Sequence, residues 1–145
     1  MKIVAIDDES FILDELVLNL KEAFPEGEIV PFNRPLEALE WLKTNEASYV
    51  FTDRHMPGIS GNELVLKIEE LYPNISCFIM SAEPSSTLVK ENIPLERCIF
   101  KPYNAKKIKE AVSKENLPSF HRNDNNESKD SVKEGKGLFA KLFKK

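Results

Sequence analysis

Short apolar runs that alternate five times with segments of helical period constrain the fold of this chain more than any other feature. The runs are rich in β-branched and aromatic residues and lie at residues 2–6, 27–32, 48–53, 75–81 and 97–101. The first of them, KIVAI, is apolar at nearly every position. Such a run is typical of a parallel strand that is covered on both faces. Between the runs, apolar residues recur at spacings of three and four, as on one face of a helix.

Local signals set the bounds of the expected helices. Ser10 offers an N-cap to a first helix that ends before Pro25, and Pro35 is placed at the first position of a second helix, with Leu36, Leu39 and Leu42 inward. The remaining helices are expected at residues 62–71, 85–91 and 105–114. The helix at 85–91 is the weakest, since a proline lies on either side of it.

Repeated strand–helix units require right-handed crossovers within a parallel sheet. The pattern therefore predicts an α/β fold, a (βα)5 doubly wound sheet of five parallel strands with helices on both faces. In such sheets, reactive groups gather at the carboxyl ends of the strands, near the point where the strand order reverses. The residues that end each strand are therefore the first candidates for a functional site.

Charge divides the chain after Leu117. The whole chain has a formal net charge of −4, and residues 118–145 contain seven Lys or Arg and four Asp or Glu, a net +3 that leaves −7 for residues 1–117. An acidic body of this kind disfavours nucleic acid as a direct partner. The sequence shows neither a secretory leader nor an apolar run of about 18 residues, so we expect a cytoplasmic protein. Cys77 and Cys98 lie in strand-like runs and are expected to be buried apolar side chains.

Polar side chains mark the ends of four expected strands. They are Asp7, Asp8 and Glu9 after the first strand, Asp53 at the end of the third, Ser81 at the end of the fourth and Lys101 at the end of the fifth. Clustered carboxylates cannot all stay ionised unless a cation neutralises them, and Mg²⁺ prefers such hard oxygen ligands. We therefore expect Mg²⁺ to be bound by Asp7, Asp8 and Asp53, with the backbone carbonyl of His55 turned towards the same ion.

Asp53 is placed to act as a nucleophile. A carboxylate can accept a phosphoryl group as an acyl phosphate, and positive charge on the transferring oxygens lowers the barrier. Lys101 would supply such a charge beside the metal, and Ser81 would offer its hydroxyl to a phosphoryl oxygen. The expected catalytic residues are therefore Asp53, Lys101 and Ser81.

The segments IDDES, FTDRHMPGISG, FIMSAE and IFKPY, in this order and spacing, resemble the receiver domain of bacterial two-component response regulators over about residues 1–117. The resemblance implies a flavodoxin-like strand order 2-1-3-4-5 and Asp53 as the phospho-acceptor. It also implies that Asp8 is a more direct Mg²⁺ ligand than Asp7, and that a cis peptide bond precedes Pro102.

The resemblance also implies roles for residues beside the acceptor. His55 and Glu83 would tune solvent access to the phosphoryl group. Three residues before the lysine, receivers usually carry a Tyr or Phe that changes rotamer when the switch hydroxyl moves. Cys98 occupies that position here, and a small thiol cannot move between two pockets as a ring does.

The function that follows from the resemblance is that of a single-domain response regulator, not an enzyme acting on other molecules. A sensor histidine kinase or a histidine phosphotransfer protein would donate the phosphoryl group, and the signal would pass by docking to a downstream protein or by phosphorelay. One alternative is a receiver-like scaffold that works without phosphorylation, for which Cys98 and the altered fourth helix are the support. The other is an aspartyl-phosphate phosphatase of the haloacid-dehalogenase type, but IDDES lacks the D-x-D pattern of those enzymes.

Beyond the body, residues 118–136 are polar and predict a flexible linker, in which His121 has no expected role. Residues 137–145, GLFAKLFKK, predict a short basic amphipathic helix. An isolated helix needs about 12–15 residues, so this one would form only on a membrane face or in a partner's groove. Its contact residues would be Leu138, Phe139, Leu142, Phe143 and Lys141. Attachment at the inner membrane or a cell pole would follow; folding back onto the body, or no role at all, also stays open.

Overall fold

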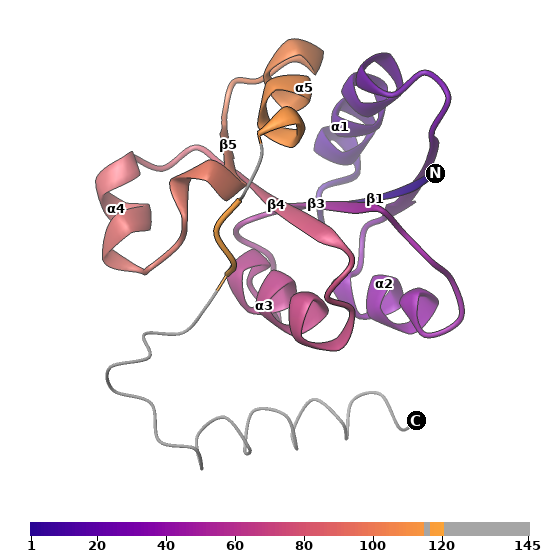
Figure 1. Cartoon of the computed structure of the whole chain (residues 1–145), viewed down its shortest axis with the longest axis horizontal. Helices are drawn as coiled ribbons and strands as arrows, with labels where there is room; N and C mark the ends of the chain where they lie inside the picture. The colour runs from indigo at the N-terminus through magenta and orange to yellow at the C-terminus, as the bar shows by residue number, and fades with distance from the viewer. Residues whose placement is uncertain (115–116, 121–145) are drawn as a thin grey trace.

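Five parallel strands form the centre of the computed structural model, which describes residues 1–114 and 117–120 (Figure 1). The strand order is β2-β1-β3-β4-β5, and each neighbouring pair is parallel. The strands are β1 (Lys2–Ile6), β2 (Glu28–Phe32), β3 (Tyr49–Asp53), β4 (Ser76–Ser81) and β5 (Cys98–Phe100). The predicted α/β class, the doubly wound sheet and its order 2-1-3-4-5 are confirmed.

Helices follow the strands in turn, and they cover both faces of the sheet. They are α1 (Ser10–Ala23), α2 (Pro35–Leu42), α3 (Gly61–Leu71), α4 (Ser85–Lys90) and α5 (Ala105–Ser113), with a single 3-10 turn, η1 (Leu95–Arg97), before β5. In Figure 1, α1 and α5 lie on one face, and α2 and α3 lie on the other. The short α4 lies to one side, beyond β4 and η1.

The alternation of side chains along each strand divides the core into two clusters. Val4, Val50 and Cys77 face α2, α3 and α4, whereas Ile3, Phe51 and Phe78 face α1 and α5. Both clusters are built from side chains that are fully or almost fully buried. Cys77 and Cys98 are free thiols within this core, as the sequence predicts.

Two details of the helices differ from the sequence prediction. Leu36 was expected to point inward, but it is 54% exposed, and α2 instead buries Ala38, Leu39 and Leu42 together with Pro35. The reason is the first turn of the helix, where the proline itself takes the inward position. Ser10 begins α1 rather than capping it, and Glu9 precedes the helix without a side-chain cap.

Residues 117–120, which we call the C-terminal strap, cross from one face of the sheet to the other. Leu117 packs against the cluster of α1 and α5, and Phe120 is buried in the cluster of α3 and α4. Figure 1 shows the strap passing beside β5 towards α3. The sequence placed a flexible linker from residue 118 onward, and that boundary stays a prediction. The structure adds that residue 120, a single aromatic ring in an otherwise polar segment, is buried against the body.

Part of the sequence prediction falls on residues that the structure does not describe. The rest of the linker, His121 and the amphipathic helix at 137–145 lie outside the described residues. Within residues 1–114 and 117–120, no helix combines the length and the apolar character needed to cross a membrane.

Candidate functional site

Three carboxylates meet at the carboxyl edge of the sheet. Side-chain oxygens of Asp7, Asp8 and Asp53 all lie within 4.8 Å of one another. Strand register explains the meeting: Ile6 pairs with Thr52, so the residue after each of these, Asp7 and Asp53, leaves the sheet at the same level. A set of oxygen ligands at this spacing fits Mg²⁺, which binds carboxylates together with water and phosphate oxygens.

Burial makes the negative charge of this cluster costly. Asp7 is only 4% exposed, and burial raises its pKa to about 6, with further upward contributions from the charges of Asp53 and Asp8. The backbone N–H of Glu9 donates to Asp7 Oδ1 at 3.0 Å, and this hydrogen bond lowers the pKa of Asp7. The positive charge of Lys101 also lowers it. The cluster therefore carries more negative charge than its protein surroundings neutralise, which is the condition that a bound divalent cation relieves.

Lys101 and Ser81 complete the same edge. Lys101 Nζ donates to Asp53 Oδ1 at 2.6 Å, an ion pair in which the Asp53 side chain is 14% exposed. Ser81 pairs with Phe100 across β4 and β5, which brings the hydroxyl and the lysine to neighbouring strand ends. Ser81 is 2% exposed, and its Oγ accepts a hydrogen bond from the Glu83 N–H at 3.0 Å. The Lys101–Pro102 peptide bond is cis, as the resemblance implies.

The loop after Asp53 is fixed to the end of β3 by close backbone contact. The Gly61 N–H donates to the Arg54 carbonyl at 2.7 Å. A Cβ atom at Gly61 would lie 2.2 Å from the Asp53 carbonyl oxygen, so only glycine fits here without moving the acceptor backbone. Ser60 then caps α3 by accepting from the Glu63 N–H. The contribution of the His55 carbonyl to the metal site stays a prediction.

His55 and Glu83, which the sequence paired only by resemblance, contact each other beside the site. The His55 side chain is 71% exposed, and its Nε2 meets Glu83 Oε1 in a short contact. Hydrogen bonds from His55 and Arg54 lower the pKa of Glu83. The two residues therefore form a polar border next to the acceptor.

Sequence reasoning missed Arg54, the residue directly after Asp53. Arg54 is 3% exposed, and its guanidinium forms ion pairs with both Glu83 and Glu91. Arg54 Nε also donates to Asn62 Oδ1 at 3.3 Å. The one available signal was the charge itself, since an arginine in the middle of a strand-end motif must find carboxylates or solvent.

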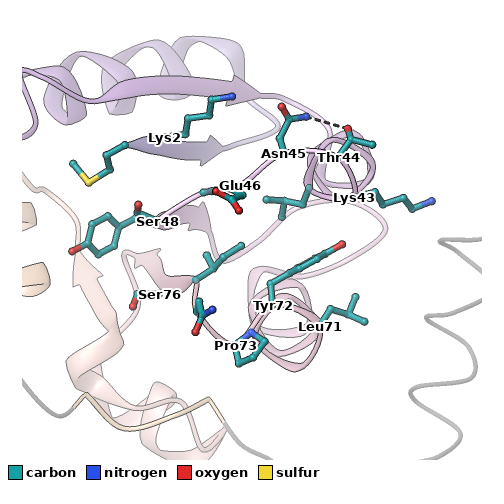
Figure 2. A pocket seen from close by; sticks show the side chains of 16 residues that line it. Lys2, Lys43, Thr44, Asn45, Glu46, Ser48, Leu71, Tyr72, Pro73 and Ser76 are labelled. Carbon is teal, nitrogen blue, oxygen red and sulfur yellow. Dashed lines mark hydrogen bonds between the residues drawn. The ribbon is translucent and has the colours of Figure 1, made fainter.

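A pocket at the other end of the strands contrasts with this site. Figure 2 shows it between the chain that precedes β3 and the chain that precedes β4, with Lys2, Ser48 and Ser76 among its labelled side chains. These residues lie at or beside the amino ends of β1, β3 and β4, opposite Asp53. The pocket is therefore remote from the acid cluster, and we assign no chemistry to it.

Comparison with known proteins identifies the class. Residues 3–113 match the family model of the response regulator receiver domain. The transcriptional regulatory protein LytR of Staphylococcus aureus strain N315 is 29% identical over 128 residues, which cover 88% of this chain and 52% of LytR. The chain thus spans about half the length of the curated relatives of this name. With most of its length matched by the family model, the chain belongs to the response regulator receiver domain family.

Solved structures agree with the family. A response regulator receiver domain protein from Clostridium thermocellum has a TM-score of 0.63 and 26% identity, with 77% of this chain and 90% of that chain covered. The chemotaxis response regulator CheY4 of Vibrio cholerae has a TM-score of 0.64 at 20% identity, with coverage of 77% and 94%, and supports the fold. Receiver domains of this family take part in two-component signal transduction and generally bind Mg²⁺ at an acidic pocket, and the cluster of Asp7, Asp8 and Asp53 provides such a pocket.

Proposed function

We propose that Asp53 is the phospho-acceptor of a two-component signalling switch. The donor is a phosphohistidine on a sensor histidine kinase or a histidine phosphotransfer protein. Mg²⁺ is held by Asp7, Asp8 and Asp53, and the His55 carbonyl adds a further ligand. The observation that supports this most directly is the geometry around Asp53: a lysine Nζ at 2.6 Å from one of its oxygens and two further carboxylates within 4.8 Å.

The residues divide the phosphoryl transfer between them. An Asp53 oxygen forms the bond to phosphorus while the phosphorus–nitrogen bond of the donor breaks, and the electron pair stays on the imidazole nitrogen. Mg²⁺, when bound, supplies positive charge to the transferring oxygens. Lys101 provides a second positive charge from the protein, placed where negative charge gathers on the phosphoryl group.

Ser81 is suited to recognise the product. Its oxygen already accepts a hydrogen bond from the Glu83 N–H at 3.0 Å, and its own O–H remains able to donate to a phosphoryl oxygen. A hydroxyl in this position senses whether Asp53 is phosphorylated. The only reactions proposed are phosphorylation of Asp53 and its reversal.

The proposed readout is protein docking or phosphorelay. Residues 1–117 carry a net charge of −7, which supports a protein partner over nucleic acid. The alternative of a scaffold that works without phosphorylation is separated by capture of partners with and without a beryllofluoride mimic. Partner binding that is unchanged by the mimic and by Asp53→Asn favours the scaffold.

Intact-mass measurement after incubation with Mg²⁺ and acetyl phosphate tests the acceptor. The wild-type chain should gain one phosphate, and Asp53→Asn, which keeps the size of the side chain, should gain none. Asp14→Asn is a matched control, because Asp14 lies exposed on α1 and this change should leave phosphorylation unaltered. Phosphate retained in Asp53→Asn contradicts the assignment, and sustained turnover of a phosphate ester revives the phosphatase alternative.

A further inference from the structure

Arg54 connects the acceptor to both ends of α4. Its guanidinium pairs with Glu83, which lies just before α4, and with Glu91, which follows the last residue of that helix. Burial alone would lower the pKa of Arg54, but these two carboxylates raise it above its ordinary value. One buried cation therefore holds the two ends of a six-residue helix together. We call Arg54, Glu83 and Glu91 the Arg54 clamp.

Little else fastens α4 to the body. Of its six described residues, Leu88 alone is buried, and Val89 is 57% exposed. Glu91 also sits at the carboxyl end of the helix, where the helix dipole disfavours a carboxylate. The guanidinium offsets that unfavourable placement. The position of α4 thus depends on Leu88, on the buried Ile93 that follows the helix and on the Arg54 clamp.

The other end of the clamp is joined to Asp53 by short covalent and hydrogen-bonded links. Arg54 follows Asp53 in the chain, and its N–H donates to the Met80 carbonyl on β4 at 3.1 Å. Glu83 is tied to Ser81 through its own N–H. If a phosphoryl group on Asp53 draws the Ser81 hydroxyl towards it, the Glu83 backbone must follow, and the pairing of Glu83 with Arg54 must change. Because Glu91 pairs with the other terminal nitrogen of the same guanidinium, a movement of the guanidinium at Glu83 reaches the far end of α4.

Cys98 explains why such a device is needed in this chain. Its side chain is short, and Sγ donates to the Pro94 carbonyl at 3.4 Å, so it has no ring to move. Burial raises the pKa of the Cys98 thiol to about 11, and the positive charge of Arg54 acts in the opposite direction. Position 98 therefore offers no ring whose rotamer could report on Ser81.

We propose that Arg54 is the positioning residue that couples the phosphorylation state of Asp53 to the position of α4, through its simultaneous ion pairs with Glu83 and Glu91. The inference rests on the proposed role of Asp53. In the unmodified protein, the Arg54 clamp holds both ends of α4. After phosphorylation, one end of α4 is released.

Hydrogen exchange of the α4 segment, measured with and without Mg²⁺ and beryllofluoride, tests the coupling. In the wild-type chain, loading should speed α4 exchange about five-fold, as expected when one ion pair is lost. In Arg54→Gln, α4 should exchange fast from the start, and loading should change it by less than about two-fold. Binding of beryllofluoride itself, followed by fluorine NMR, should be retained, because Arg54 does not contact the acid cluster.

Two Glu→Gln variants complete the design. Glu91→Gln removes only the partly exposed partner and should also abolish the response of α4, which keeps the proposal testable if Arg54→Gln fails to fold. Glu40→Gln, which breaks the surface pair with Lys43, is the matched control and should respond like the wild type.

The outcomes separate this inference from the proposed function. If loading speeds α4 exchange in Arg54→Gln as much as in the wild type, the proposed role of Arg54 is wrong. Where Arg54→Gln does not fold, the same result in Glu91→Gln contradicts that role. The role of Arg54 is also wrong if loading leaves α4 exchange unchanged in the wild-type chain. In both cases the phospho-acceptor proposal stands. If the wild-type chain takes up neither beryllofluoride nor phosphate, the acceptor proposal fails and this inference fails with it.

Discussion

Arg54 and Arg97 are both nearly buried, with 3% and 7% exposure, yet their partners differ in kind. Arg97 Nε donates to the Pro118 carbonyl at 2.9 Å, and Nη1 donates to the Cys77 carbonyl at 3.3 Å. Its guanidinium also lies 5.7 Å from the ring centre of Phe78 and 5.5 Å from that of Phe120. Arg54 is held mainly by side-chain carboxylates of a loop and a helix end.

The difference teaches what each arginine can do. Backbone carbonyls of a strand and rings of a core keep fixed positions, so Arg97 joins the strap, β4 and α3 permanently, with Glu69 as an ion-pair partner at 3.4 Å. Carboxylates on flexible side chains can exchange partners without unfolding anything. The region around Arg97 is therefore structural, and the region around Arg54 is suited to switching.

The largest expected effect is on stability, from loss of Arg97. Arg97→Met leaves two carbonyls without donors and Glu69 without a cation in a place where burial already raises its pKa, so the free energy of unfolding should fall by about 3–4 kcal/mol. Urea denaturation measures this. Arg34→Met, whose side chain is 77% exposed in a surface pair, should change stability by about 0.5 kcal/mol at most. If both variants lowered the free energy of unfolding equally, the structural role of Arg97 would be contradicted.

Gly61→Ala tests whether the acceptor region also contains a rigid part. The new methyl group meets the Asp53 carbonyl, so the free energy of unfolding should fall by about 2–3 kcal/mol, and the rate of Asp53 phosphorylation should fall about ten-fold or more. Gly58→Ala is the control: nothing crowds that position, but its φ of +88° is strained for alanine, so it should lose only about 1 kcal/mol of stability. Normal phosphorylation of Gly61→Ala would contradict the close contact.

A pH series measures the cost of burying Asp7 in the acid cluster beside Asp53. The pKa of Asp7 is about 6 in the folded chain against an ordinary 3.8, so the folded chain binds a proton more tightly than the unfolded chain. Without Mg²⁺, the free energy of unfolding should therefore decrease as pH rises from about 4 to about 6, by about 2 kcal/mol from this group.

Asp7→Asn should remove that part of the pH dependence and should be more stable than the wild type at pH 7 without metal. Thermal unfolding across the pH range measures both effects. Saturating Mg²⁺ should stabilise the wild type more than the variant. A pH dependence that is identical in the two proteins contradicts the assignment to Asp7.

The smallest effect compares two buried thiols: Cys98, which follows the segment from α4 to η1, and Cys77 on β4, whose carbonyl accepts from Arg97. In a Cys77→Ala background, Arg54→Gln should speed alkylation of Cys98 about five-fold, because α4 opens locally. In a Cys98→Ala background, the same change should leave alkylation of Cys77 unaltered, since Cys77 is fully buried beside the Arg97 region. Equal acceleration at both thiols would mean that the two regions open together.

The strand ends were predictable from the sequence because the information is local. Each apolar run ends on its own polar residue, and the parallel topology alone places Asp7, Asp53 and Lys101 at one edge. The two arginine networks were not predictable, because their partners are distant in the chain. Glu83 and Glu91 lie 29 and 37 residues from Arg54, and Pro118 lies 21 residues from Arg97.

The packing of the strap escaped prediction for a related reason. A polar stretch with one aromatic ring has the composition of a linker. The burial of Phe120 becomes visible only in the folded structure, where the cluster of α3 and α4 receives its ring. Composition describes what a segment lacks, whereas docking of a short segment depends on the surface that receives it. The same limit applies to Leu36, whose exposure follows from how Pro35 packs.

The path of the strap decides which end of the sheet it covers. Phe120 reaches the α3 side, and Arg97 ties Pro118 to Cys77 near the start of β4, at the end of the strand remote from Ser81. The strap is therefore anchored at the pole of the domain opposite Asp53 and Lys101. The described part of the strap thus leaves the carboxyl edge of the sheet accessible to any molecule that approaches Asp53.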